Sequence, residues 1–196
     1  MSTVDKANGS EKANRSKMDD GSRKTIRSKK GNGSKKDNTS GMIADAIKLG
    51  QKLDYNGQDL LPVGWMRFSC EYQGWEEYWC LTKDGAGLWL CSESATMAIQ
   101  KRTLLTEPIV VSDLKFGAHI SFRGQRFIVA ETGEAVVTAS EGTNPEGLRE
   151  GDTFGYSHLT AADGQIVTFE TLKGKLTVFE GHWINPSLLR IKGGAQ

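Results

Sequence analysis

The chain has 196 residues, with 25 Lys or Arg against 24 Asp or Glu, and 37% of its residues are hydrophobic. This length suits one domain of ordinary size. No apolar run approaches the roughly 20 residues of a membrane-spanning helix, and the N-terminus lacks the apolar core of a signal peptide, so we expect a cytoplasmic protein. The three cysteines, an odd number, are expected to be reduced thiols.

Residues 1–41 form a basic, polar segment. They carry 11 Lys or Arg and 5 Asp or Glu, whereas residues 42–196 carry 14 and 19, so a charge of +6 precedes one of −5. With few large apolar residues the segment cannot offset its ordering entropy, and we predict a disordered arm. It either contacts anionic lipid or nucleic acid weakly or serves as a solubilising tail. Its main basic residues are Lys24, Arg27, Lys29, Lys30, Lys35 and Lys36.

Residues 42–59 are predicted to be a short helix and a linker. The helix would cover 42–53, because apolar residues recur there at helical spacing. They are Ile43, Ala46, Ile47 and Gly50. A helix this short is marginal alone, so we expect it to dock on the body or on a partner.

The stretch Gly74–Leu90 contains three of the five Trp residues. Trp75, Glu77 and Trp79 alternate with other side chains as in a strand, and Asp84-Gly85 provides a hairpin turn. This hairpin must therefore bury its aromatic surface or present it as a binding face.

From residue 60 onward the chain is predicted to be a series of strands separated by Gly-rich turns. Besides the hairpin, the predicted strands are 65–72, 95–105, 116–122, 126–132, 135–140, 152–160, 165–172, 176–180 and 187–191. About ten short strands favour a mainly all-β fold, an antiparallel roll, sandwich or barrel. We expect one β-rich domain over 60–191, whose two halves pack face to face, and a flexible tail over 192–196.

No sequence motif for catalysis is present. The chain lacks a G-x-S-x-G elbow and the glycine loops of nucleotide-binding proteins. Its three His residues are widely separated, and the cysteine spacings do not resemble a zinc motif. The sequence therefore predicts no catalytic residues, no cofactor and no metal site.

Carboxylates inside predicted strands are the best candidates for a binding site. If Glu77 and Glu170 face inward, burial should raise their pKa unless a cation or N–H donors are close, and the candidate cations are Arg67, Arg123 and Arg126. Such residues serve acid–base chemistry or cation capture, or they fix strand ends by hydrogen bonds. The full candidate set is Trp75, Glu77, Tyr78, Glu141, Tyr156, Glu170 and Glu180.

Several separated motifs resemble one family when read in order. The first is Trp75-Glu76-Glu77-Tyr78 with Leu81 and Trp89-Leu90; the second is Phe127-Ile128-Val129, Ala135-Val136-Val137 and Glu141-Gly142; the third is Tyr156, Thr168-Phe169-Glu170 and Val178-Phe179-Glu180-Gly181. Over Leu60 to Leu189 the chain resembles the bacterial domain of unknown function family 4178. Phe127 and Phe179 replace a frequent Tyr of that family, and Thr168 a frequent Ser.

The resemblance implies no established biochemical activity. Members often neighbour genes for membrane-remodelling proteins, which implies an accessory role in envelope stress. We therefore expect a non-enzymatic binding or scaffold protein with a protein partner, in the cytoplasm or at the inner membrane surface. The alternatives are a small-molecule or metal binder, or an enzyme, using Glu77 and Glu170, and a nucleic-acid binder using the arm.

Overall fold

Alternation of apolar and polar side chains builds more than half of the described chain into β-strands. The computed structural model describes residues 47–193, so the predicted arm and its basic residues lie outside it. The strands are β1 (Leu53–Tyr55), β2 (Gln58–Ser69), β3 (Gly74–Thr82), β4 (Gly87–Glu93), β5 (Thr96–Thr103), β6 (His119–Phe122), β7 (Gln125–Gly142), β8 (Thr153–Thr160), β9 (Gln165–Leu172), β10 (Lys175–Ile184) and β11 (Leu189–Ile191). Two short 3-10 turns, η1 (Val111–Asp113) and η2 (Pro186–Leu188), interrupt the loops.

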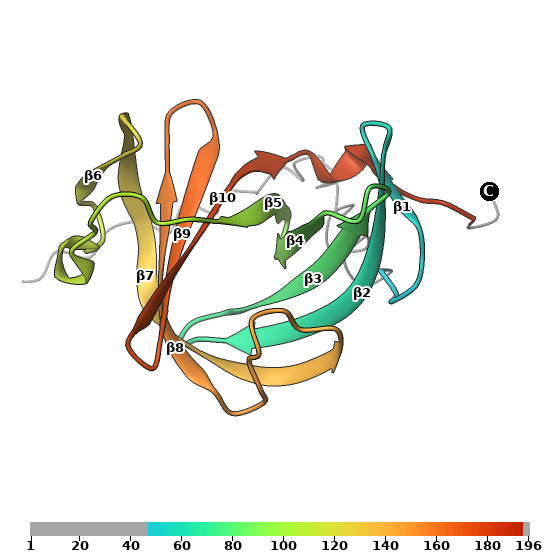
Figure 1. The fold of residues 1–196 in the computed structure, drawn as a ribbon, viewed down its shortest axis with the longest axis horizontal. Helices are drawn as coiled ribbons and strands as arrows, with labels where there is room; N and C mark the ends of the chain where they lie inside the picture. Colours follow the sequence, from blue (N-terminus) through green and yellow to red (C-terminus); the bar gives the residue numbers. More distant parts are fainter. Residues whose placement is uncertain (1–46, 194–196) are drawn as a thin grey trace, which may run out of the picture. The chain divides into compact units, whose positions relative to one another are not determined.

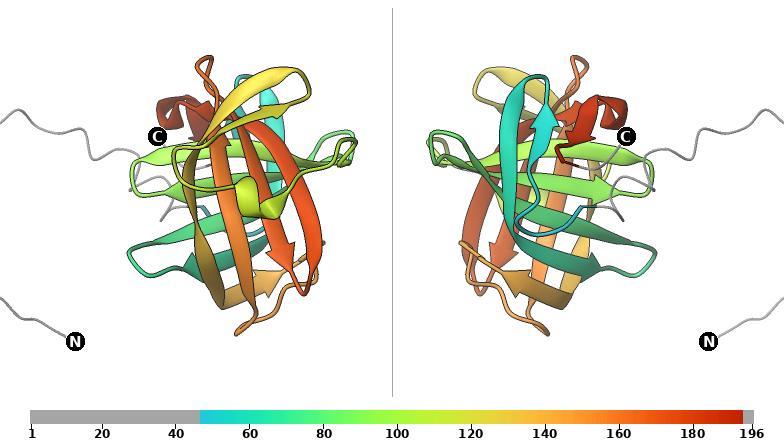
Figure 2. Two further views of the ribbon diagram at one scale, coloured as in Figure 1. Left: turned by 90° about the vertical axis from the view of Figure 1, so that its left-hand side faces the viewer. Right: turned by 90° about the vertical axis from the view of Figure 1, so that its right-hand side faces the viewer.

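Eight of these strands close into an antiparallel barrel. Their order is β2-β3-β4-β5-β10-β9-β8-β7, and β7 pairs back onto β2, with Phe68 opposite Val137. Figure 1 shows the barrel, and Figure 2 shows β3 to β5 crossing β8 to β10 steeply. The all-β prediction is confirmed. Of the predicted alternatives, a roll, a sandwich or a barrel, the structure is a barrel. The two halves join edge to edge, through β5–β10 and β2–β7, instead of packing face to face.

Two-residue turns of Xaa-Gly set the register of three hairpins. Asn56-Gly57, Arg123-Gly124 and Lys173-Gly174 have positive φ at both residues. That backbone matches the right-handed twist of paired strands, and glycine adopts it without a steric cost at the second position.

The predicted turn at residues 133–134 does not form. Gly133 lies within the continuous strand β7, directly opposite Tyr156. A Cβ at Gly133 would lie 3.3 Å from the Tyr156 hydroxyl oxygen. This glycine therefore allows an aromatic ring to approach the backbone, a role that a sequence pattern cannot distinguish from a turn.

The predicted short helix is wrong for the part of it that the structure describes. Residues 47–52 form a turn, in which Gly50 has φ of +77°. The Gly50 N–H donates to the Pro62 carbonyl at 2.8 Å, and the next residues enter β1. Backbone pairing with β2 thus overrides the helical spacing of a few apolar residues. Between residues 47 and 193 there is no α-helix.

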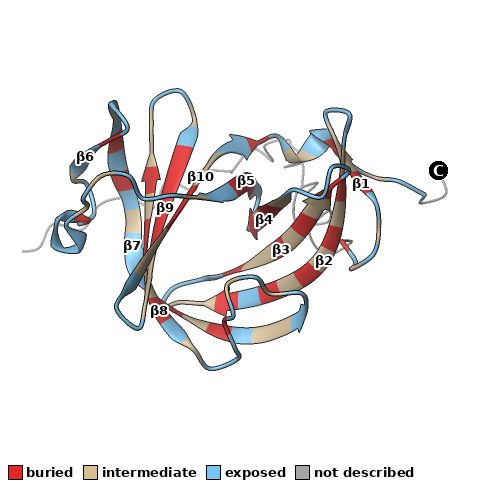
Figure 3. Cartoon of the chain, in the orientation of Figure 1, coloured by how far each residue is buried: buried red, intermediate tan, exposed pale blue. Residues whose placement is uncertain are grey.

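Both faces of the barrel sheet carry apolar clusters. The interior holds Met66, Phe68, Trp75, Trp89, Val137, Phe154, Tyr156 and Phe179, among others. Two outer clusters lie beneath β1 and β11, and beneath the segment 109–118 with β6. Figure 3 shows buried positions alternating with less buried ones along β2 and β3. Within 47–193, no helix is long and apolar enough to cross a membrane.

Candidate functional site

Five polar residues gather inside the barrel, and we call them the interior polar cluster. Pairing of the strands places Glu77 of β3 opposite Cys91 of β4, and Gln100 of β5 opposite Trp89. Glu170 of β9 lies opposite Tyr156 of β8. Because alternate residues share one face of a strand, these side chains point inward with the aromatic residues. The cluster consists of Glu77, Cys91, Gln100, Glu146 and Glu170.

A chain of hydrogen bonds links part of this cluster across three strands. The Trp75 indole Nε1 donates to Glu77 Oε1 at 2.9 Å. The Cys91 thiol also hydrogen-bonds Glu77, and Gln100 Nε2 donates to Cys91 Sγ at 3.6 Å. These bonds fix the Glu77 carboxyl in place.

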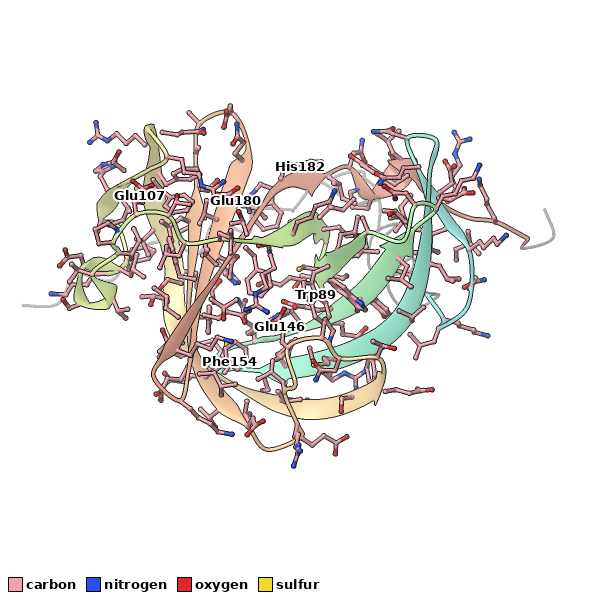
Figure 4. The ribbon with its side chains drawn as sticks, in the orientation of Figure 1. Trp89, Glu107, Glu146, Phe154, Glu180 and His182 are labelled. Atoms are coloured by element: carbon pink, nitrogen blue, oxygen red, sulfur yellow. The ribbon has the colours of Figure 1, made fainter. Side chains whose placement is uncertain are left out.

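Glu146 reaches the cluster from the loop between β7 and β8. Asn144 Oδ1 accepts hydrogen bonds from the backbone N–H groups of Glu146 and Gly147, at 3.1 and 3.0 Å, and the Leu148 side chain is buried. Arg102 Nη1 of β5 lies 3.1 Å from Glu146 Oε2. Figure 4 shows Glu146 and Trp89 within the space that the strands enclose.

Burial dominates the acidity of the interior carboxyls. It raises the pKa of Glu77 to about 7, although the hydrogen bonds from Trp75 and Cys91 oppose the rise. Burial, followed by repulsion from Glu77 and Glu146, raises the pKa of Glu170 well above its usual range. Near neutral pH, Glu77 is therefore partly protonated, and Glu170 holds its proton more tightly than an exposed carboxyl does. Each of the two residues is nevertheless only half-buried, and Glu77 lines interior space.

Several polar groups inside the barrel have no partner. Trp89 Nε1 and Gln100 Oε1 make no hydrogen bond with any of residues 47–193, although their residues are only 2% and 7% exposed. The Glu170 carboxyl likewise receives no hydrogen bond from the described residues. A buried polar atom without a partner costs about 1–3 kcal/mol. The interior is therefore built to hydrogen-bond something beyond the described side chains.

A cavity of about 40 Å³ is lined by Gln100 and Glu77, but not by Trp89 or Glu170. One water needs only about 10–15 Å³ of such space. Polar walls come from Glu77, Cys91 and Gln100, and Trp183, which is 45% exposed, marks the way out to solvent.

Glu131, on β7, organises a second polar group, of which His158 lines the cavity. The Tyr156 hydroxyl and Gln73 Nε2 both donate to Glu131 Oε1. Burial and the bond to Glu131 raise the pKa of Tyr156. His158 Nδ1 lies 3.9 Å from Glu131 Oε2, yet burial lowers the His158 pKa more than Glu131 raises it. This histidine is therefore mainly neutral near pH 7.

Three of the predicted candidates lie outside the barrel. Tyr78 packs in the outer cluster beneath β1 and donates to Glu76 at 2.8 Å. It lines an outer groove of about 470 Å³ together with Glu141. Glu180 faces outward. Its Oε1 atom makes no hydrogen bond within 47–193. This atom lies 3.0 Å from Arg123 Nε, and we interpret the contact as an ion pair. The structure thus brings together Trp75, Glu77, Tyr156 and Glu170, but not Tyr78, Glu141 or Glu180.

The predicted cations do not neutralise the interior carboxyls. Arg67 binds Glu76 at 2.7 Å and Arg123 binds Glu180, both on the outside. Sequence reasoning missed Gln100, Glu146 and the polar role of Cys91. The hairpin register could have placed Cys91 opposite Glu77, whereas nothing in a polar loop marks Glu146 as pointing inward.

The comparisons with known proteins identify a family and nothing finer. No curated protein and no solved structure matches the chain. Among the described residues, no group of three or more His, Cys, Asp or Glu side chains is placed to hold a metal ion. The family model described as "Domain of unknown function (DUF4178)" matches residues 48–186. This match covers every strand of the barrel, and the chain belongs to this family of domains of unknown function.

Proposed function

We propose that the domain is a binding module for a small molecule, which enters the barrel and contacts the interior polar cluster. The observation that carries the proposal is the pair of buried, unpartnered atoms Trp89 Nε1 and Gln100 Oε1. Native proteins pair most such atoms, so a bound molecule or ordered water must complete this set.

The dimensions of the fold support this proposal. An eight-stranded barrel has an interior that side chains just fill or that holds one small ligand. Here the side chains leave interior space beside the carboxyls of Glu77 and Glu93, and burial raises the pKa of both. Binding sites commonly combine apolar walls with a few converging polar groups of perturbed pKa.

Indole N–H signals in a nuclear magnetic resonance spectrum test the proposal. The five Trp residues of the full chain give five signals, to be assigned by single Trp→Phe variants. A library of neutral and charged fragments should include members that shift Trp89 and Trp75, while Trp65 in the outer groove stays unchanged. A library whose members shift only Trp65, or none of the five, would exclude interior binding.

A scaffold role in envelope stress is a second proposal, favoured by two exposed aromatic residues. Tyr72 and Phe116 are 86% and 77% exposed and line the same outer hollow, of about 720 Å³. Exposed apolar groups at a concave surface are typical of protein-binding sites. Cross-linking in cells should capture a protein partner with the wild type and less of it with a double Tyr72→Ser, Phe116→Ser variant. Equal capture by both proteins would refute a role of the hollow in binding that partner.

Contact of the basic arm with anionic lipid or nucleic acid also remains a proposal. The concentration of Lys and Arg in residues 1–41 favours it. Binding to anionic vesicles or to single-stranded RNA should weaken steeply with salt and vanish when residues 1–41 are deleted. Salt-independent binding, or binding by the shortened chain, would contradict it.

A further inference from the structure

Charge inside the barrel is strongly one-sided. The titratable groups of the interior polar cluster are Glu77, Cys91, Glu146 and Glu170, and Arg102, whose side chain is 45% exposed, pairs with Glu146. Glu93 and His158 also line the cavity, and Glu131 and Tyr156 lie next to His158. Arg102 is the one permanent cation among these described groups, and Glu146 already engages it at 3.1 Å.

Unpartnered hydrogen-bonding groups show the same imbalance. Gln100 Oε1 is an acceptor at the cavity wall, the Glu170 carboxyl becomes a pure acceptor once it loses its proton, and Trp89 Nε1 is one donor outside the cavity lining. A ligand that completes this set should bring more donors than acceptors. An ammonium group brings three donors and no acceptor.

From the excess of carboxyls and acceptors, we infer that the ligand of the barrel is a small primary amine, bound as its ammonium ion. The inference rests on the proposed function and specifies the ligand class. The ammonium group contacts Gln100 Oε1 and the Glu77 carboxylate, both of which line the cavity, and Glu170 lies close enough to Glu77 for the two carboxyls to repel each other. Indole rings are the strongest cation–π partners among side chains, and Trp75 and Trp89 belong to the same interior cluster.

The walls of the cavity also set the shape of the amine. Beyond its polar end the cavity is lined by Ala98, Ile166 and Trp183, which are apolar. A short alkyl chain attached to nitrogen would contact these side chains and extend toward solvent at Trp183. The volume of about 40 Å³ excludes bulky substituents unless the side chains move.

Binding of the cation is coupled to loss of a proton. Burial raises the pKa of the Glu170 carboxyl well above its usual range, so in the free protein this carboxyl holds its proton more tightly than an exposed one. A positive charge beside it favours the carboxylate. One carboxylic acid proton therefore passes to solvent as the ammonium ion enters, and the total charge inside the barrel is unchanged.

Three probes of similar size test the ligand class on the full chain. They are n-butylammonium chloride, n-butanol and sodium butyrate, compared by titration calorimetry near neutral pH in two buffers of different ionisation enthalpy. We expect n-butylammonium to bind most tightly, with release of about one proton. Glu170→Gln should abolish the proton release and weaken binding about tenfold or more, because a hydrogen bond to a charged group is lost.

Two further variants make the test specific. Gln100→Met removes the unpaired acceptor at nearly constant volume and should also weaken n-butylammonium binding. Glu141→Gln changes an exposed carboxyl in the outer groove and should leave binding unchanged. A urea unfolding curve for each variant establishes that it is folded.

The outcomes separate this inference from the proposed function. Equal or tighter binding of n-butanol or butyrate, or n-butylammonium binding without proton release, would overturn the amine assignment while leaving interior binding intact. Failure of all three probes, when library fragments do shift the Trp89 indole signal, would also overturn the amine alone. Failure of the probes and of every fragment would overturn both.

Discussion

Replacing Glu77 by Gln should change how the stability of the protein depends on pH. Burial raises the pKa of this carboxyl from 4.5 to about 7 in the folded chain. The unfolded chain therefore loses this proton first as pH rises. Stabilisation from the protonated carboxyl is complete below pH 4.5 and decreases until pH passes the folded pKa.

The expected size follows from the difference between the two pKa values. At about 1.4 kcal/mol for each pH unit, Glu77 alone lowers the free energy of unfolding by about 3 kcal/mol between about pH 4.5 and about pH 7. Glu170 acts in the same direction, since its folded pKa is also raised. Burial lowers the pKa of His158, so this group stabilises the fold as pH rises toward 6.5. Because several groups contribute to the pH dependence of the wild-type protein, comparing the Glu77→Gln and Glu141→Gln variants isolates the contribution of Glu77.

Urea unfolding followed by Trp fluorescence, at intervals from about pH 5 to about pH 8, measures this dependence. Glu77→Gln should flatten the decrease, and it should also lower the Glu170 pKa by removing the neighbouring charge. Glu141→Gln, at an exposed position, should keep the wild-type slope. The reasoning is refuted if Glu77→Gln retains the same slope as the wild type and Glu141→Gln.

The remaining predictions concern packing and thiol reactivity. Gly181→Ala should lower the free energy of unfolding by about 2–3 kcal/mol, because a Cβ would lie 1.8 Å from the Ile99 carbonyl oxygen. Gly155→Ala should change the free energy of unfolding little, because its added Cβ would have contacts no closer than 3.9 Å. Similar unfolding midpoints for the two variants would contradict this account. Phe169→Ala should cost about 3–5 kcal/mol because its ring is 1% exposed, and an equal loss in the exposed Phe116→Ala variant would be inconsistent with that origin. Burial raises the pKa of Cys80 to about 12, so a thiol reagent at about pH 8 should label it only in urea; rapid labelling of the native protein would show that the thiol is accessible.

Local chemistry was sufficient to predict much of the fold from sequence. The period-two pattern of Trp75, Glu77 and Trp79, with the Asp84-Gly85 turn, predicted the β3–β4 hairpin, because strand alternation and positive-φ turns depend on neighbouring residues alone. The excess of strands and glycines predicted an all-β body. The family resemblance is also confirmed, by a match over residues 48–186.

Tertiary pairing decided what local patterns left open or suggested wrongly. Residues 47–52 had helical spacing, yet the Gly50 N–H bonds Pro62 of β2 and the chain turns. Gly133 had the chemistry of a turn, yet it lies in an unbroken strand opposite Tyr156.

The candidate site depends on the closure of the barrel. The sequence selected Glu77 and Glu170, because a carboxyl within an apolar strand is unusual, but it also selected Glu141 and Glu180, which face outward. Whether a strand residue points inward depends on register, and β5–β10 and β2–β7 set that register by joining segments far apart in the chain. Glu146 joins the other carboxyls because its loop folds toward the interior and pairs it with Arg102. Sequence alone thus pointed to Glu77 and Glu170, and only closure of the barrel decided which polar side chains meet them, because strand register and the path of the Glu146 loop depend on long-range pairing.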